Sequence, residues 1–250
     1  MRRRVCFLSG CTIVISAVFL FILTGPVKGG DFKESFANIS EGALLTTLPK
    51  WTHTTTGPDN WVLSNFDTEG GGFEASAKGA YHRNMADTEA ITLGKGSYSF
   101  KTKIRFTGAN SYVSVHIDLM ETGGVNGCGI CFNSGAGGGS SDTTIAISES
   151  GKSWGDVKYN TPKAHWAPNV WYVVEFNDLN TKSGKLTGTV SIYDKGNPST
   201  KLVDNAPIVA YGDPMGFDKI DIISISSFGA DRPFQIGEID LGKSNSESSN

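Results

Sequence analysis

Two stretches of strict alternation constrain the fold of this chain most. Apolar side chains alternate with Ser, Lys and Arg over residues 97–106, and a second alternating run covers residues 112–120 after the turn at residues 107–110. A two-residue period is typical of a β-strand with one buried face and one solvated face. The sequence therefore predicts two adjacent antiparallel strands joined as a hairpin.

The rest of the chain repeats this arrangement of short strands separated by turns rich in Gly, Pro and Asn. No long helical periodicity intervenes. About fourteen strands without helices predict an all-β protein built as an antiparallel sandwich or barrel. The predicted strands span residues 31–36, 61–66, 72–77, 90–93, 97–106, 112–120, 128–133, 143–148, 156–159, 171–177, 186–193, 208–211, 219–228 and 234–241.

The N-terminus has the features of a secretory signal peptide. Three arginines precede an apolar run over residues 12–23, and Val27-Lys28-Gly29 offers a site for signal peptidase. We expect residues 1–29 to be a signal peptide, residues 30–242 to form one β-sandwich domain, and residues 243–250 to be a disordered polar tail. The alternative is an uncleaved membrane anchor. Whether the segment is cleaved or stays as an anchor, residue 30 onward is expected outside the cytoplasm, in a secreted, extracellular or periplasmic protein.

Cleavage after residue 29 would leave an acidic chain without a transmembrane segment. It removes four of the 22 Lys and Arg residues and none of the 25 Asp and Glu residues, so the net charge becomes −7. No basic cluster remains in the sequence. Nucleic acid and anionic membrane surfaces are therefore poor candidates as partners.

The order of the predicted strands resembles a concanavalin A-like (laminin-G-like) jelly roll. The resemblance rests on the Gly-rich step into Phe73-Glu74-Ala75, the alternating runs at residues 96–121, the strands at residues 171–176 and 189–194, and the closing segment at residues 237–241. It implies an all-β antiparallel sandwich of that family. At fold level it also implies a non-catalytic, lectin-like module that binds a glycan or an extracellular polysaccharide. Two alternatives are a structural or adhesive surface protein and a degenerate glycoside hydrolase or lyase.

A near-match to a glycosidase motif ends the second alternating run. Laminarinase-type enzymes with this fold carry Glu-x-Asp-x-x-Glu on one strand, where a bulge brings the nucleophile and the acid/base to about 5–5.5 Å from each other. Asp118 and Glu121 fill the second and third positions, but His116 stands in place of the nucleophile. Because an imidazole cannot readily replace that carboxylate, we expect a polar strand face or a non-catalytic sugar site.

Aromatic residues in polar surroundings supply further candidates for sugar binding. Trp154, Tyr159 and Trp166 lie in a loop-rich stretch, whereas Trp51, Trp61 and Trp171 are predicted to lie in the core. An aromatic ring can cover the C–H face of a pyranose while polar groups bind its hydroxyls. Ordinary packing at a sheet edge is the alternative. The candidate binding residues are His116, Asp118, Glu121, Trp154, Trp166, Tyr81, His82 and Arg83.

Cys128 and Cys131 are the only cysteines after the signal-like segment. Residues three apart on a regular strand point to opposite faces, so a disulfide between them would need a bulge or a turn. Two free thiols, or a redox or metal role, are the alternatives. No cofactor is expected apart from a structural calcium ion with Asp240 as one ligand, as in similar sandwiches. Calcium needs about six or more oxygens, and the sequence does not identify the others.

Overall fold

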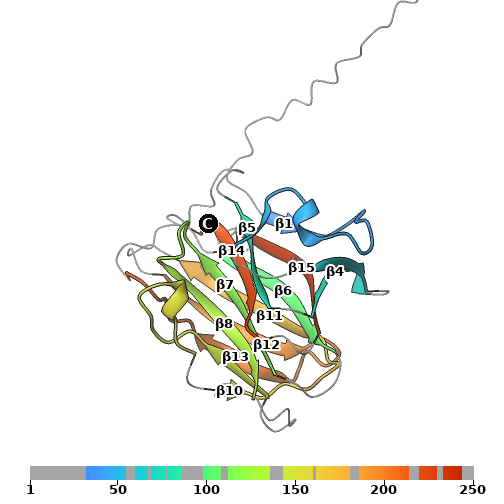
Figure 1. Cartoon of the computed structure of the whole chain (residues 1–250). Coiled ribbons are helices and arrows are strands. Elements are labelled where there is room, and N and C mark those ends of the chain that lie inside the picture. The colour runs from blue at the N-terminus through green and yellow to red at the C-terminus, as the bar shows by residue number, and fades with distance from the viewer. Residues whose placement is uncertain are drawn as a thin grey trace, which may run out of the picture.

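The computed structural model describes residues 32–54, 60–66, 69–76, 78–85, 98–107, 112–135, 143–159, 162–180, 186–213, 220–229 and 233–243. These residues form two antiparallel sheets that pack face to face (Figure 1). The predicted all-β sandwich is therefore confirmed, with fifteen strands where about fourteen were expected. The signal-like segment lies outside the described residues. Among the residues that the structure does describe, no helix is long and apolar enough to cross a membrane.

Sheet A contains eight strands. Seven follow the order β13 (Lys201–Pro207), β12 (Thr187–Asp194), β11 (Tyr172–Asn180), β6 (Tyr98–Phe106), β15 (Phe234–Lys243), β4 (Gly71–Ala75) and β3 (Val62–Asn65). The eighth, β1 (Phe32–Glu34), also pairs with β15. The final strand therefore includes Lys243, which the sequence had assigned to the polar tail.

Sheet B contains seven strands. Their order is β10 (Pro162–Ala164), β9 (Thr143–Ile147), β8 (Gly127–Ser134), β7 (Val113–Met120), β14 (Ile222–Ser227), β5 (Gly79–Asn84) and β2 (Trp51–His53). Two short 3-10 helices, η1 (Leu45–Thr47) and η5 (Trp154–Asp156), interrupt the connections. In the described part of the chain, every regular helical element is thus a single turn long.

The two alternating runs do not form the predicted hairpin. β6 pairs with β11 and β15 in sheet A, whereas β7 pairs with β8 and β14 in sheet B. Both strands nevertheless bury their apolar faces in the same core, where Phe100, Ile104, Val115 and Ile117 are completely buried. The prediction was wrong because a period of two tells which face of a strand is buried and does not tell which strand lies beside it.

The remaining differences concern weakly patterned strands. The strand predicted at residues 156–159 is part of η5 and a loop with an isolated bridge at Lys158. The strand predicted at residues 208–211 is replaced by β13, which ends at Pro207 and carries a register shift and Asn205 at φ 46°. The short strands β2, β5 and β10 were not predicted. The strand predicted at residues 90–93 lies outside the described residues.

Aromatic rings form much of the core between the sheets. Trp61 stacks on Phe73 and Tyr81, with ring centroids 5.6 and 4.2 Å apart. Trp51 is buried in the same cluster, so the predicted core positions of both tryptophans are confirmed. Trp171 is also buried, but its ring packs against Phe66 and lies under the side chains of Lys103 and Arg105.

Candidate functional site

A polar cluster occupies the face of sheet B that points away from the core. Because Val115 and Ile117 of β7 point into the core, the intervening residues of that strand point outward. The cross-strand registers of β14, β8 and β5 place small or polar residues beside them. We call this set the outer cluster: Ser114, His116, Asp118, Gly129, Cys131, Ser224, Ser226 and His82.

Asp118 is the centre of the outer cluster and has no solvent exposure. Its Oδ1 accepts a hydrogen bond of 2.6 Å from the Tyr159 hydroxyl, and its Oδ2 accepts one of 3.3 Å from the Trp154 indole N–H. Burial raises the pKa of this carboxyl to about 7, against the smaller lowering effect of the two donors. Asp118 therefore ties two aromatic side chains to the sheet.

Both of these aromatic residues come from one loop, residues 149–159. The ends of the loop pair through backbone hydrogen bonds between Glu149 and Lys158 (2.9 Å) and between Lys158 and Ser150 (2.8 Å). Inside the loop, Asp156 Oδ1 accepts two backbone N–H groups at 2.7 Å. The backbone N–H of Trp154 donates to the Gly124 carbonyl at 2.7 Å, which fixes the loop to the turn between β7 and β8.

The two histidines of the outer cluster lie against these aromatic side chains. His116 Nε2 is 3.0 Å from Ser114 Oγ and 3.5 Å from Cys131 Sγ, and its ring meets that of Tyr159 edge to face at 4.7 Å. The His82 ring meets Trp154 in the same way at 5.5 Å. Burial lowers the pKa of both histidines to about 4, so both imidazoles are neutral at physiological pH.

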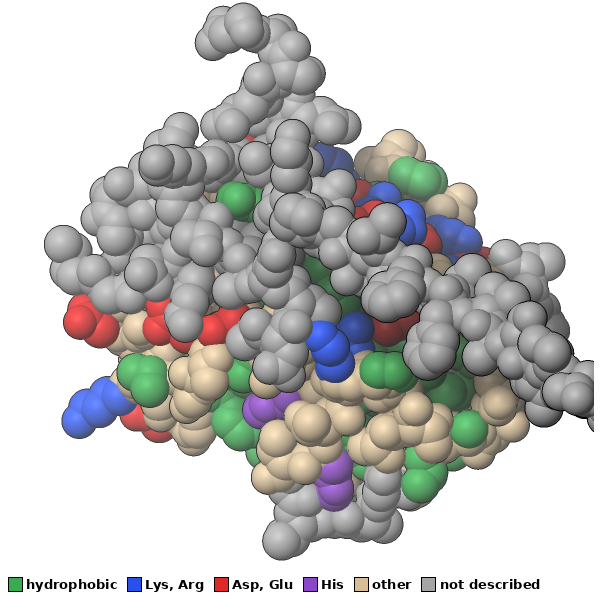
Figure 2. Space-filling model, turned by 90° about the horizontal axis from the view of Figure 1, so that it is seen from above, with side chains coloured by type: hydrophobic (Ala, Val, Ile, Leu, Met, Phe, Trp, Pro, Cys, Tyr) green, Lys and Arg blue, Asp and Glu red, His purple; other side chains and the backbone are tan. Residues whose placement is uncertain are grey.

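A further ring contact joins His116 to an exposed aromatic side chain. The His116 ring also meets Phe228 edge to face at 5.1 Å, and Phe228 is 49% exposed. Seen from above, the surface of the molecule shows histidine side chains near hydrophobic and Lys or Arg side chains, while acidic side chains gather at another part of the same view (Figure 2). We call the residues whose rings are linked in this way the aromatic row: His82, Trp154, Tyr159, His116 and Phe228.

Four of the eight candidate binding residues are thus brought together: His116, Asp118, Trp154 and His82. Glu121 is not among them, because it lies in the turn after β7 and accepts a hydrogen bond of 2.8 Å from Asn126 Nδ2. Its contact with Asn126 makes it part of the turn that also holds Trp154.

The other three candidates point away from the outer cluster. Tyr81 is fully buried in the core between Trp61 and His53, and Trp166 is 3% exposed and stacks on Phe106 at 4.2 Å. Arg83 donates to the Pro49 carbonyl and lies 3.9 Å from Glu34. Tyr81 and Arg83 are separated from His82 because successive residues on β5 point to opposite faces.

Several residues of this region are not among the eight candidates. Tyr159 was grouped with Trp154 and Trp166 for its polar surroundings, and Ser224 and Ser226 belong to a predicted strand to which no binding role was assigned. The alternation of Ile and Ser over residues 223–226 is the signal that could have placed both serines on one face. No pattern in the sequence indicates that the loop at residues 149–159 would fold over them.

The two cysteines of β8 are free thiols. Cys128 belongs to the core cluster, whereas Cys131 lies beside His116 on the outer face. β8 runs through both positions in register with β7, without the bulge that a disulfide would need, so the disulfide alternative is not realised. Burial raises the pKa of the Cys131 thiol to about 12.

Asp240, the residue suggested as a calcium ligand, lies on β15. Asp240 Oδ2 lies 3.4 Å from Lys33 Nζ in an exposed ion pair. Over the part of the chain that the structure covers, no group of three or more His, Cys, Asp or Glu side chains is arranged to hold a metal ion.

Comparisons with known proteins bear on the fold. No family model matches the sequence, and no curated protein matches it. The globular domain of T. cruzi calreticulin is similar in structure, with 11% identity, a TM-score of 0.54, and coverage of 86% of this chain and 89% of that one. A protein of unknown function from Shewanella oneidensis MR-1 has 14% identity and a TM-score of 0.49 over 98% of this chain and 100% of that one. A carbohydrate esterase from the Shiga toxin-encoding bacteriophage phi24B has 12% identity and a TM-score of 0.45 over 78% and 90%. At these identities, the calreticulin likeness supports the β-sandwich fold alone.

Proposed function

We propose that this protein is an extracellular, concanavalin A-like β-sandwich that binds a neutral glycan through the aromatic row on sheet B. The observation that carries the proposal is a pair of ring-contact sets, His82 with Trp154 and Tyr159 with His116 and Phe228, which the hydrogen bonds of Trp154 and Tyr159 to Asp118 hold on one face. Aromatic faces and edges bind the C–H surfaces of sugar rings, and neighbouring polar groups bind the hydroxyls.

The charge state of the face favours a neutral ligand. Both histidines have pKa values lowered to about 4 and are uncharged near pH 7. Asp118 is buried beneath Trp154 and Tyr159, and both of its oxygens already accept hydrogen bonds. The side chains of the aromatic row are therefore uncharged near pH 7, and the hydroxyl of Thr54 lies 3.4 Å from His82 Nε2.

Two serine hydroxyls beneath this face support a functional role. Ser224 and Ser226 are completely buried, and neither hydroxyl has a hydrogen-bond partner among the described residues. Leaving such a group unpaired costs about 1–3 kcal/mol. Alanine would pack in the same space without that cost, so stability alone does not account for serine at both positions. Buried polar groups that lower stability in this way are concentrated at functional sites.

Cleavage of the glycan is not part of the proposal. In the motif that would support cleavage, His116 stands in place of the nucleophilic carboxylate. Glu121 accepts a hydrogen bond from Asn126, and Asp118 is completely buried. A purified protein that releases reducing or unsaturated ends from a polysaccharide would replace binding with the hydrolase or lyase alternative. A glycan array without any signal across plant, algal and host sugars would favour the structural or adhesive alternative.

Replacing Trp154 with alanine is expected to weaken binding of the array-identified glycan by about tenfold or more, because a central aromatic contact is lost. Trp154→Phe keeps a ring and should retain more of the affinity. Affinities are measured by isothermal titration calorimetry on proteins whose circular dichroism spectra match.

The matched control is Leu44→Ala, which truncates a partly exposed apolar side chain beside β3 of sheet A. We expect it to bind the glycan as the unmodified protein does. Equal losses in Trp154→Ala and Trp154→Phe would contradict the role of the ring and assign the effect to the hydrogen bond with Asp118.

A further inference from the structure

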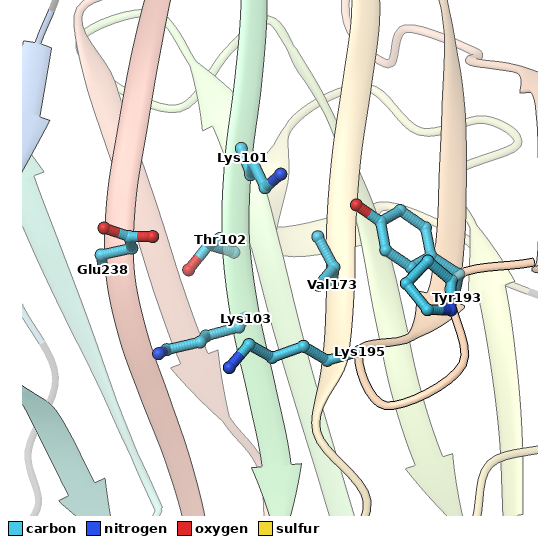
Figure 3. A pocket seen from close by; sticks show the side chains of 8 residues that line it. Lys101, Thr102, Lys103, Val173, Tyr193, Lys195 and Glu238 are labelled. Carbon is cyan, nitrogen blue, oxygen red and sulfur yellow. The ribbon is translucent and has the colours of Figure 1, made fainter. Parts of the chain in front are cut away.

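A pocket of about 300 Å³ lies in sheet A, away from the aromatic row. Its walls come from β6, β11 and β15 and from the end of β12, and Figure 3 shows Glu238 on one side of β6 and Tyr193 on the other. The volume is at the lower end of the range for small-molecule sites, which is about 300–1,000 Å³. It suits a ligand the size of one sugar unit.

The side chains that line the pocket carry more positive than negative charge. Three ammonium groups, those of Lys101, Lys103 and Lys195, face one carboxylate, that of Glu238. In Figure 3 the side chains of Lys103 and Lys195 extend toward the same side of the pocket. An anionic group of a ligand would meet two cations there at once.

The two lysines share one acidic partner, which holds them in place without cancelling both charges. Lys103 Nζ lies 3.2 Å from Glu69 Oε2, and Lys195 Nζ contacts the same oxygen. The hydrogen bond from Lys195, opposed by burial and reinforced by Lys103, lowers the pKa of Glu69, so this carboxylate stays charged. One negative charge is therefore shared by two positive ones, which leaves one positive charge in excess in this trio.

Neighbouring residues fix the lysine side chains. The stem of Lys103 lies over Gly237, where an added Cβ would approach Lys103 Cε to 2.1 Å. Lys101 Nζ is held 2.8 Å from Glu175 Oε1, which also accepts the Tyr193 hydroxyl at 2.7 Å. Because an ordered side chain loses less entropy when it binds a ligand, this arrangement suits recognition.

We propose that this pocket binds an acidic sugar, a single pyranose unit that carries a carboxylate or a sulfate. The acidic group lies beside the Glu69 carboxylate and contacts the ammonium groups of Lys103 and Lys195, which that carboxylate already holds. The C–H face of the ring packs against the apolar wall of Val173, Tyr193 and Pro198, and Glu238 accepts hydrogen bonds from hydroxyls. This site goes beyond the neutral-glycan site on sheet B and shares no residue with it.

The test is calorimetric titration of the purified protein, at low and at high salt, with glucuronic acid, glucose 6-sulfate and glucose. We expect at least one of the two acids to bind, glucose to bind much more weakly, and affinity to fall as salt rises. The double variant Lys103→Gln/Lys195→Gln should bind the acid about tenfold to a hundredfold more weakly, because charge-assisted hydrogen bonds are lost. Comparing the two acids identifies the acidic group.

The control Lys201→Gln removes an exposed lysine of sheet A that pairs with Asp204 outside the pocket, and it should leave binding unchanged. The proposal is overturned if neither acid binds, if glucose binds as tightly as the acids, or if the double variant binds as the unmodified protein does. Trp154→Ala should retain acidic-sugar binding. The proposals for the two binding sites can therefore be contradicted independently of each other.

Discussion

Replacing Gly129 with alanine is expected to lower the free energy of unfolding by about 3 kcal/mol. An added Cβ at this position would lie 2.1 Å from Asp118 Oδ1 and 2.8 Å from the Ile117 carbonyl oxygen. The carbonyl belongs to a paired strand and cannot move freely. The carboxyl could move only by giving up its hydrogen bonds from Tyr159 and Trp154 while it remains buried.

Gly155→Ala is the matched control, because nothing lies within 4 Å of the Cβ that it would add in η5. Its unfolding free energy should differ from that of the unmodified protein by no more than about 0.5 kcal/mol. Both variants are measured by guanidinium chloride unfolding, with the midpoint and the slope compared. A loss in Gly129→Ala no larger than that in Gly155→Ala would show that Asp118 is not held as tightly as its contacts indicate.

The fold was predictable in the parts where side-chain alternation is strong. On β6 and β7, each apolar residue of the pattern is buried, and the patterns therefore predicted strands and their inner faces correctly. The partner of each strand depends on contacts between distant segments, such as β6 with β15 and β7 with β14. Nothing in a local period encodes those pairings, so the hairpin prediction failed.

The site was predictable only in part for a related reason. His116 and Asp118 were expected on a solvated strand face, but a loop from residues 149–159 covers that face and buries Asp118. The mixed outcome for Tyr81, His82 and Arg83 follows from missing β5 as a strand. Once that strand is known, the two-residue period separates His82 from its two neighbours.

Stability should depend on pH through Asp118 in the direction opposite to that of an ion-paired aspartate, whose pKa is lowered on folding. The pKa of Asp118 is about 7 in the folded protein and close to 3.8 when the side chain is solvated. Between these values the folded state holds a proton that the unfolded state has lost. The stabilising contribution is therefore complete below about pH 4 and disappears as the pH rises through 7, a total of up to about 4 kcal/mol.

The titratable neighbours of Asp118 must be separated from this effect. The hydroxyls of Tyr159 and Tyr211 and the thiol of Cys131 keep their protons over this range, because burial raises their pKa values. His82 and His116 have the opposite effect to Asp118. Their pKa values fall from 6.5 to about 4 on folding, so they add stability as the pH rises from 4 to 6.5. The free energy of unfolding of the unmodified protein should therefore change less with pH than Asp118 alone would make it change.

Asp118→Asn isolates the contribution of the carboxyl, because the histidines remain in both proteins and cancel in the difference. We expect the stability of the variant relative to the unmodified protein to shift in favour of the variant by up to about 4 kcal/mol between pH 4 and pH 8. The measurement is denaturant unfolding of both proteins across this range. Asparagine cannot accept both N–H and O–H donors as a carboxylate does, so the absolute offset between the curves carries that cost at every pH. The change with pH in the difference between the two unfolding free energies reports only the proton on Asp118. Parallel curves of unfolding free energy against pH would mean that Asp118 titrates in the folded protein as it does in water.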